Sequence, residues 1–477
     1  MKILLFSLLL IPFLFTRTHQ LSSQPLVITH VTVIDISAPD SLRAVKLDQT
    51  VVITGNQITA VGKTGKVKVP PDSRVVDAEG RYMIPGLWDM HVHSMLEGRP
   101  EYFFPLFIAN GITGVRDMGG GFSFDRLSQI RKQLASGKIV GPRLGAVAGR
   151  ILDGPGARTN VGLAVGTADE AKQTVKAFKQ GGADFIKVYD WLSREVYLAI
   201  VDEAKQQGLP VAGHVPFSMS AEEVSDLGQQ SIEHTTDVFI SSSRDEDELR
   251  KELRRQTESA NGSQSSRVQA ELKAVGSYDE GKARSLYARF AHNGTWQCPT
   301  LVVRRAAALA DNNQLANDNR MKYIPSAVRN NWNETFKLIA STSDVEARKR
   351  RFQKTLEIVG AMQRAGVGIL AGTDTLNPYV YPGFSLHDEL GLLVQAGLTP
   401  MQALRTATLN PAKFLGLFET LGTIDKGRLA DLVLLDANPL DDIRNTQRIH
   451  AVVANGRYFP REALQRLFAE AEAAAGK

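Results

Sequence analysis

Two histidines separated by one residue are the first feature of this sequence that could do chemistry. His91 and His93 lie in the segment PGLWDMHVHSM, at the end of an apolar run. Because residues i and i+2 of a strand point to the same face, both imidazoles can reach one metal ion. A single H-x-H pair is weak evidence, so a metal role depends on what other parts of the chain supply.

Three later apolar runs also contain residues that can bind metal or move protons. The segment PVAGHVP contains His214, QSIEHTT contains His234 and GILAGTDT contains Asp374. Taken singly, such a histidine or aspartate is more often a satisfied structural residue. Together they would bring side chains from several strands to one place, which is how barrel enzymes assemble a site. Cys298 is the only cysteine, so a zinc site built from thiolates is excluded.

A lysine, Lys187, interrupts the run GADFIKVYD, which otherwise has the composition of a buried strand. A lysine is almost never fully buried without a partner, and the simplest partners here are Asp184 and Asp190. Burial also lowers the pKa of a lysine and makes a neutral, nucleophilic amine accessible. Such an amine can add carbon dioxide to form a carbamate, which is a carboxylate on a long stem. The spacing alone leaves both interpretations open.

The elements that must position these residues alternate along the centre of the chain. Short apolar runs are separated by helical stretches such as DEAKQTVKAFKQGG and TLEIVGAMQRAG. This alternation predicts an α/β fold, most economically a (β/α)8 TIM barrel with its active site at the carboxyl ends of the strands. Short β-rich runs before and after this centre, with a hairpin signal at Gly55 and Asn56, predict a small β-sandwich domain formed by both chain ends.

A chain of 477 residues is too long for one ordinary domain. We expect the β-sandwich domain at residues 24–84 and 417–460, the barrel at 85–416 and a C-terminal helix at 461–477. A polar segment near residues 241–354 is longer than two β/α units need and predicts a helical insertion around one strand at Trp296–Val303. This insertion could form a lid or wall over the barrel mouth, or it could be a solvated decoration.

The first residues of the chain have the features of a targeting segment. Lys2 precedes an apolar run from Ile3 to Phe15, and a helix of that length reaches about 20 Å, short of the roughly 30 Å hydrocarbon core. We therefore expect a signal peptide at 1–23 and an exported protein, periplasmic or secreted, that contacts membrane only if this segment stays uncleaved. The formal charge of +5 is small for the length, so nucleic-acid binding is not expected.

In combination, these motifs resemble the amidohydrolase superfamily, specifically its members in which a carbamylated lysine bridges two metal ions. The resemblance is carried by PGLWDMHVH, GADFIKVY, AGHV, SIEH and GTD, and by the tail segments GLTPMQALRTATLNPAKFLGL and GTIDKGRLADLVLLDANPL. It covers nearly everything after the targeting segment. It makes the carbamate the preferred interpretation of Lys187.

The resemblance implies a binuclear metal centre bridged by the carbamate of Lys187. A metal-activated hydroxide would attack a bound amide or ester, and the carboxylate of Asp374 would take the proton and deliver it to the leaving group. Zinc fits the imidazole-rich ligand set, and manganese and cobalt are alternatives. The implied ligands are His91, His93 and Asp374 for the first ion, and His214 and His234 for the second.

Two further residues are candidates for contacts with substrate. Tyr189 lies two positions after Lys187 and should share its face, so its hydroxyl could contact the substrate carbonyl. A core tyrosine bonded to a neighbour would fit that position equally well. Arg116, in GVRDMGG, could bind a substrate carboxylate near the barrel mouth, or it could only pair with Asp117.

The predicted function is metal-dependent hydrolysis of a C–N bond in a small molecule. Similarity to prolidase-like and imidazolonepropionase-related members implies dipeptides or N-acyl amino acids as substrates. One departure matters, because many peptidase-like members carry a GGHG loop after the third strand, where this chain has GRILDGPGAR. Two alternatives stay open: a phosphotriesterase- or lactonase-like ester hydrolase on the same centre, and an exported metal- or solute-binding protein without turnover. We also expect a homo-oligomer.

Overall fold

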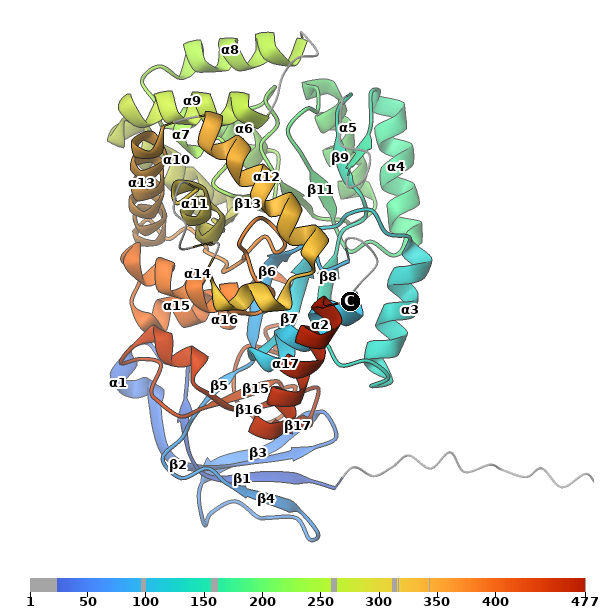
Figure 1. Ribbon diagram of the computed structural model, residues 1–477, viewed down its shortest axis with the longest axis vertical. Coiled ribbons are helices and arrows are strands. Elements are labelled where there is room, and N and C mark those ends of the chain that lie inside the picture. The colour runs from blue at the N-terminus through green and yellow to red at the C-terminus, as the bar shows by residue number, and fades with distance from the viewer. Residues whose placement is uncertain are drawn as a thin grey trace, which may run out of the picture.

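The structure combines a β-rich region with a region of parallel strands surrounded by helices (Figure 1). The computed structural model describes residues 24–95, 100–155, 162–258, 264–310, 315, 317–342 and 344–476. The predicted signal peptide at 1–23 lies outside the described residues. Within the described ranges, no helix is both long and apolar enough to cross a membrane.

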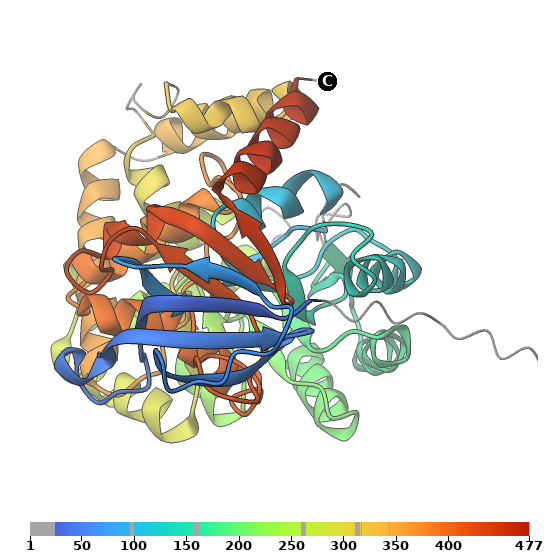
Figure 2. The same ribbon diagram turned by 90° about the horizontal axis from the view of Figure 1, so that it is seen from below.

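One eight-stranded sheet is built from both ends of the chain, as the view from below shows (Figure 2). Its strands are β1 Leu26–Ile34, β2 Val45–Thr54, β3 Gln57–Lys63, β4 Arg74–Asp77, β5 Tyr82–Pro85, β15 Leu432–Leu435, β16 Ile449–Ala454 and β17 Arg457–Pro460. The order is β17-β16-β15-β5-β1-β2-β3, with β4 paired to β1. The antiparallel pair of β15 and β5 therefore joins the C-terminal strands to the N-terminal ones.

The hairpin predicted at Gly55 and Asn56 is confirmed, because β2 and β3 pair on either side of these two residues. Gly55 has φ of 61°, a conformation that glycine adopts without steric cost. Apolar residues of the paired strands, including Ile28 and Val51, form a core of their own. The strands make one hydrogen-bonded sheet, and its closure into a two-layer sandwich stays a prediction.

Two parallel sheets form the centre of the molecule. The first contains β6 Leu87–Val92, β7 Ile112–Asp117 and β8 Arg143–Val147. The second contains, in order, β10 Gly162–Ala164, β9 Ile151–Asp153, β11 Ile186–Val188, β12 Val211–Gly213, β13 Ser231–Glu233 and β14 Trp296–Cys298. Every strand pair in these two sheets is parallel, as the β/α alternation predicts.

Three parallel bridges connect the two sheets to each other and to the segment around residues 369–375. The bridges are Ala148 with Phe185, Gln297 with Ile369, and Val92 with Thr375. Backbone pairing therefore runs from β6 through both sheets to β14, on to residues 369–375, and back to β6. The carboxyl ends of these strands consequently lie at one end of the structure.

Helices connect the parallel strands. They include α2 Pro100–Ala109, α3 Phe124–Ala135, α4 Ala168–Gly181, α5 Arg194–Gln206 and α6 Ala221–Asp226. In α4, Thr167 and Glu170 form a capping box at the start, and Gly182 with φ of 96° ends the helix. Its buried stripe, which includes Val175, packs against the strands.

The region predicted to be an insertion is mostly helical. It holds α7 Val238–Ser241, α8 Glu246–Glu258, α9 Gln264–Gly276, α10 Glu280–Asn293, α11 Leu301–Ala308, the 3-10 helix η2 Asn319–Tyr323, α12 Ser326–Thr342 and α13 Val345–Arg364. In Figure 1, α8 and α9 lie at the top, beyond the strands. The strand predicted at Trp296–Val303 ends at Cys298, because Thr300 takes φ of 47° and α11 begins at Leu301.

The remaining helices lie after residue 375 or within the eight-stranded sheet region. They are α14 Phe384–Gln395, α15 Pro400–Thr406, α16 Leu409–Phe414 and the C-terminal α17 Arg461–Ala475, with short α1 Ser41–Ala44 and η3 Ile443–Gln447. Leu464 and Leu467 of α17 share an apolar cluster with Ile108 of α2. The last helix therefore packs against the first helix of the central region.

Candidate metal centre

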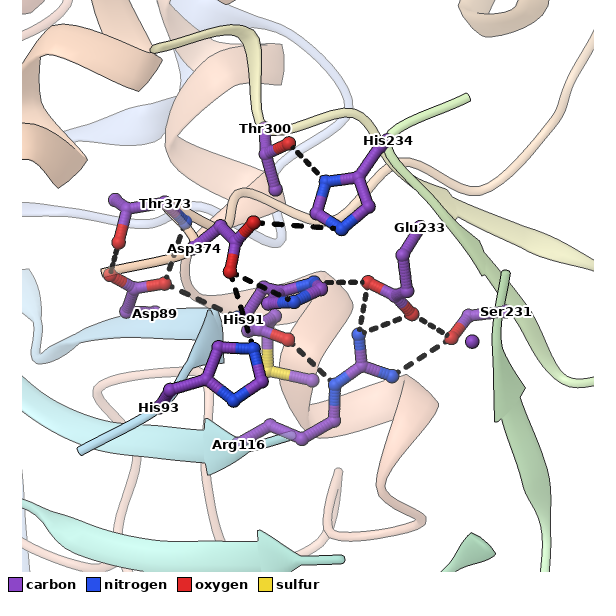
Figure 3. A network of polar contacts seen from close by, with 12 residues as sticks. Asp89, His91, His93, Arg116, Ser231, Glu233, His234, Thr300, Thr373 and Asp374 are labelled. Carbon is purple, nitrogen blue, oxygen red and sulfur yellow. Dashed lines mark hydrogen bonds and ion pairs between the residues drawn. The ribbon is translucent and has the colours of Figure 1, made fainter. Parts of the chain in front are cut away.

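The end of β6 and the segment after residue 369 bring the first predicted ligand set together (Figure 3). His91 Nε2 and His93 Nε2 lie 3.4 Å and 3.3 Å from the same oxygen, Asp374 Oδ1. The amide of Asp374 donates to the carbonyl of His91 at 2.6 Å, which fixes the two segments against each other. Two imidazoles and a carboxylate in this arrangement can hold one divalent ion.

The second predicted pair lies directly beside the first set. His234 Nε2 is 3.6 Å from Asp374 Oδ2. The ring centroid of His234 is 4.7 Å from that of His91 and 4.9 Å from that of His214. His214 follows β12 and His234 follows β13, so both arrive from the carboxyl ends of strands as predicted. The four imidazoles form one cluster next to Asp374.

Each of these imidazoles uses Nδ1 for a hydrogen bond, which leaves Nε2 for a ligand. A histidine that binds metal almost always has its other ring nitrogen held in this way. The Nδ1 partners are Glu233 Oε2 at 2.7 Å from His91, the Gly119 carbonyl at 2.7 Å from His93, Asp190 Oδ1 at 2.9 Å from His214, and Thr300 Oγ1 at 2.6 Å from His234.

Lys187 lies in the middle of β11, is 1% exposed, and its Nζ has no hydrogen-bond partner. The two predicted aspartate partners are engaged elsewhere, since Asp184 pairs with Arg131 and Asp190 with His214. The interpretation of Lys187 as half of a simple ion pair is therefore wrong. Burial lowers the pKa of Lys187 to about 8, which makes the neutral amine accessible.

Three buried nitrogens of this cluster lack hydrogen-bond partners: His91 Nε2, His214 Nε2 and Lys187 Nζ. Burying a polar atom without a hydrogen-bond partner costs free energy of folding. Three such nitrogens in one cluster therefore indicate a site for a bound group. Burial, and to a smaller extent the charge of Lys187, lowers the pKa of His91 to about 4 and also lowers that of His214. Both histidines are thus held in the neutral form that binds metals.

The prediction that Arg116 contacts substrate near the barrel mouth is wrong. Arg116 is 1% exposed, and its guanidinium donates to the Met90 carbonyl at 2.6 Å, to Ser231 Oγ at 2.9 Å and to both carboxylate oxygens of Glu233 at 2.9 Å and 3.0 Å. It does not pair with Asp117 either. Its partner Glu233 accepts from His91, so Arg116 holds the carboxylate that orients His91 (Figure 3).

A cavity of about 350 Å³ is lined by Arg116 and by none of the four histidines of the cluster. Its lining includes Pro210 and Gln230, which directly precede β12 and β13. The cavity is therefore at the amino ends of the strands. Among its lining residues, the Gln230 side-chain amide donates to the Phe414 carbonyl at 3.4 Å.

Asp89 is a buried residue that the sequence analysis did not single out. Its Oδ1 accepts from the amides of His91 at 3.2 Å and Thr373 at 3.0 Å, and its Oδ2 accepts from the Thr373 hydroxyl at 2.6 Å. It therefore ties β6 to the residue that precedes Asp374. The signal was present in PGLWDMHVH, because Asp89 is two positions before His91 and shares its face.

Tyr189 lies against the second histidine pair. Its ring centroid is 3.9 Å from that of His214, with an angle of 31° between the rings. Its amide donates to the carbonyl of Leu152, which places it where β11 and β9 end. The structure thus brings Tyr189 to the histidine cluster, and its contact with substrate stays a prediction.

A family model matches a long segment of the chain that includes the four histidines, Lys187 and Asp374. Residues 82–458 match the model of the amidohydrolase family. This chain therefore belongs to the amidohydrolase family, which confirms the predicted resemblance to that superfamily.

Known proteins of the same fold include amide hydrolases. A putative prolidase from Bifidobacterium longum is similar with a TM-score of 0.68 and 23% identity, over 94% of this chain and 99% of that one. Bottromycin amidohydrolase is similar with a TM-score of 0.72 and 23% identity, over 94% of this chain and 90% of that one. Ochratoxinase from Aspergillus niger is 38% identical over 91 residues, which is 19% of this chain and 18% of ochratoxinase. The chain thus matches less than a fifth of this curated relative.

Proposed function

We propose that this protein is a metal-dependent hydrolase that cleaves an amide or peptide-like C–N bond in a small molecule. The observation that carries the proposal is the cluster of four imidazoles and one carboxylate beside the unpaired Lys187. The parallel sheets and their bridges support a (β/α)8 TIM barrel as the frame. In such a barrel, side chains from different strand ends form the active site.

The residues present fit two divalent ions. The unpartnered Nε2 atoms of His91 and His214 are donors that such ions would satisfy. Lys187 would bridge as a carbamate, formed when its neutral amine adds to carbon dioxide with formation of an N–C bond and release of one proton to solvent. Zinc is the proposed metal because imidazoles dominate the set. The proposed ligands are His91, His93 and Asp374 for the first ion, and His214 and His234 for the second.

When bound, the ions would lower the pKa of a water molecule at the site and polarise the scissile carbonyl. The carboxylate of Asp374 lies within 3.6 Å of three imidazoles of this cluster, which supports it as the proton acceptor in this proposal. The ionised carboxylate would take a proton and return it to the leaving nitrogen.

Two structural neighbours, a putative prolidase and bottromycin amidohydrolase, support amide-type substrates such as dipeptides or N-acyl amino acids. The GRILDGPGAR segment has no histidine where the peptidase-like members carry the GGHG loop. There β9 ends in Asp153, a buried carboxylate that accepts from the amides of Trp191 at 2.6 Å and Gly154 at 2.9 Å. The proposal therefore specifies the bond and not the groups that flank it. Export of the protein and a homo-oligomeric state are also proposals.

The test combines metal analysis with a substrate panel. Protein expressed with added bicarbonate should contain two metal ions per chain, and chelation should lower kcat/KM for amide substrates by at least about 100-fold, with recovery on adding zinc. Faster turnover of lactones or phosphotriesters than of amides would instead place the protein among ester hydrolases. Two bound metals without turnover of any of these classes would make it a binding protein.

Replacement of Tyr189 by phenylalanine should lower kcat/KM without changing metal content. The phenol oxygen is lost while the ring can still stack on His214. If the hydroxyl bonds a substrate carbonyl that gains charge, the loss should be roughly 10-fold to 100-fold. Steady-state kinetics and metal analysis on the same preparation check this, and an unchanged kcat/KM would limit Tyr189 to packing.

A further inference from the structure

Helix α9 of the insertion contacts the supports of the second histidine pair. Two of its residues, Arg267 and Glu271, are four positions apart and therefore lie on one face of the helix. Arg267 is 6% exposed and Glu271 is 0% exposed. Charged residues are rarely buried to this extent unless they are paired, so the partners of Arg267 and Glu271 explain why these residues are buried.

Arg267 holds the residue that orients His214. Its Nη2 donates to Asp190 Oδ1 at 3.1 Å, and the same oxygen is 2.9 Å from His214 Nδ1. Nη2 also donates to the carbonyl of Val215, the residue after His214. The guanidinium lies 4.5 Å from the ring centroid of Phe217. Arg267 thus fixes both the carboxylate behind the imidazole and the backbone next to it.

Glu271 reaches His234 through a second arginine. Its Oε2 pairs with Arg304 Nη1 at 3.3 Å and also with Arg351, and Arg304 Nη2 donates to the carbonyl of His234 at 2.7 Å. His234 and Thr235 have φ of 60° and 52°, a backbone conformation that is strained for non-glycine residues. Such a conformation persists only where surrounding contacts impose it, and Arg304 provides one.

The first metal set is supported from a different part of the fold. His91 Nδ1 bonds to Glu233 of β13, and His93 Nδ1 bonds to the carbonyl of Gly119 after β7. Both contacts come from the central strands and the loops that follow them. The contacts of α9 described above therefore support His214 and His234, whereas His91 and His93 are supported by the central strands and their loops.

We propose that α9 positions the second metal site, and that Arg267 and Glu271 set its affinity without altering that of the first site. This inference rests on the binuclear centre in the proposed function. Arg267 and Glu271 are positioning residues, since they act through Asp190 and Arg304. Loss of such outer partners typically weakens metal binding 10-fold to 100-fold. The insertion is then a wall of the active site that completes the binuclear centre.

The test measures the affinity of each metal equivalent in two variants, Arg267→Met and Glu271→Gln. Apoprotein is titrated with zinc in competition with a chromophoric chelator, and bound metal per chain is counted after gel filtration. The second equivalent should bind about 10-fold to 100-fold more weakly in both variants, and the first should bind as in the wild type. Glu271→Gln keeps the side-chain volume, so it preserves the readout if Arg267→Met does not fold.

Lys273→Met is the matched control, because Lys273 is on the same helix in an exposed ion pair with Glu252 at 2.8 Å. It should leave both affinities unchanged. Arg267→Lys keeps the charge and should recover part of the second affinity. If both zinc affinities are unchanged in the variants, or if both are weakened equally, the proposed role of α9 is wrong. A wild-type protein that binds only one zinc would contradict the binuclear centre itself, which separates the two failures.

Discussion

Replacement of Lys187 by alanine is expected to abolish hydrolysis and to leave a protein that small carboxylic acids partly reactivate. The change removes the only proposed bridge between the two ligand sets, while the four imidazoles and Asp374 remain. Because the polarising effect of the metal pair is lost, kcat should fall on the order of 10³-fold or more. Formate, acetate or propionate can enter the space left by the lysine and supply a bridging carboxylate.

The measurement is kcat with and without added acid, together with metal content of the same samples. Wild-type protein grown with 13C-bicarbonate should also show a carbamate carbon signal in NMR spectra, and Lys187→Ala should not. The matched control is Lys349→Ala, which removes an exposed lysine paired with Glu346 and should change neither quantity. Retention of two metals and of full activity by Lys187→Ala would exclude the bridge.

The ligand cluster could be predicted because strand ends of parallel β/α units meet at one place. His91, His93, His214 and His234 each follow or end a short apolar run, and the structure brings them together. Lys187 was recognisable for a related reason, since a charge in the middle of a buried strand needs an explanation. The local apolar pattern and the order of the strands along the chain are enough to place these residues at strand ends.

The partners of these residues depend on side-chain directions that spacing does not determine. Asp190 was a candidate partner for Lys187, yet residues three apart in an extended chain point to opposite faces, and Asp190 turns to His214 and Arg267. Arg267 is 77 residues away in sequence, on a helix of the insertion. Contacts of this kind arise from packing of distant elements. The sequence therefore predicted the insertion and left its role open between a lid or wall and a solvated decoration, but it did not identify Arg267.

Replacement of Arg116 by methionine should strongly destabilise the protein. Arg116 and Glu233 are 1% and 0% exposed, and the guanidinium outweighs burial to hold the pKa of Glu233 well below its usual range. Without Arg116, a buried carboxylate loses its counter-charge, which costs about 3–5 kcal/mol of folding free energy. The fall should appear as a lower midpoint of thermal or denaturant unfolding. Activity of the remaining folded enzyme should fall as well, because Glu233 orients His91.

Two further variants separate this role from the substrate contact that the sequence suggested. Arg116→Met combined with Glu233→Gln removes both charges and keeps an oxygen that can accept from His91, so much of the lost stability should return. Arg289→Met breaks an exposed pair with Asp226 and should change the unfolding free energy by at most about 1 kcal/mol. If Arg116 bound a substrate carboxylate, Arg116→Met would raise KM for acidic substrates at unchanged stability. Its bonds to Met90, Ser231 and Glu233 predict the opposite result, a loss of stability that does not depend on the substrate.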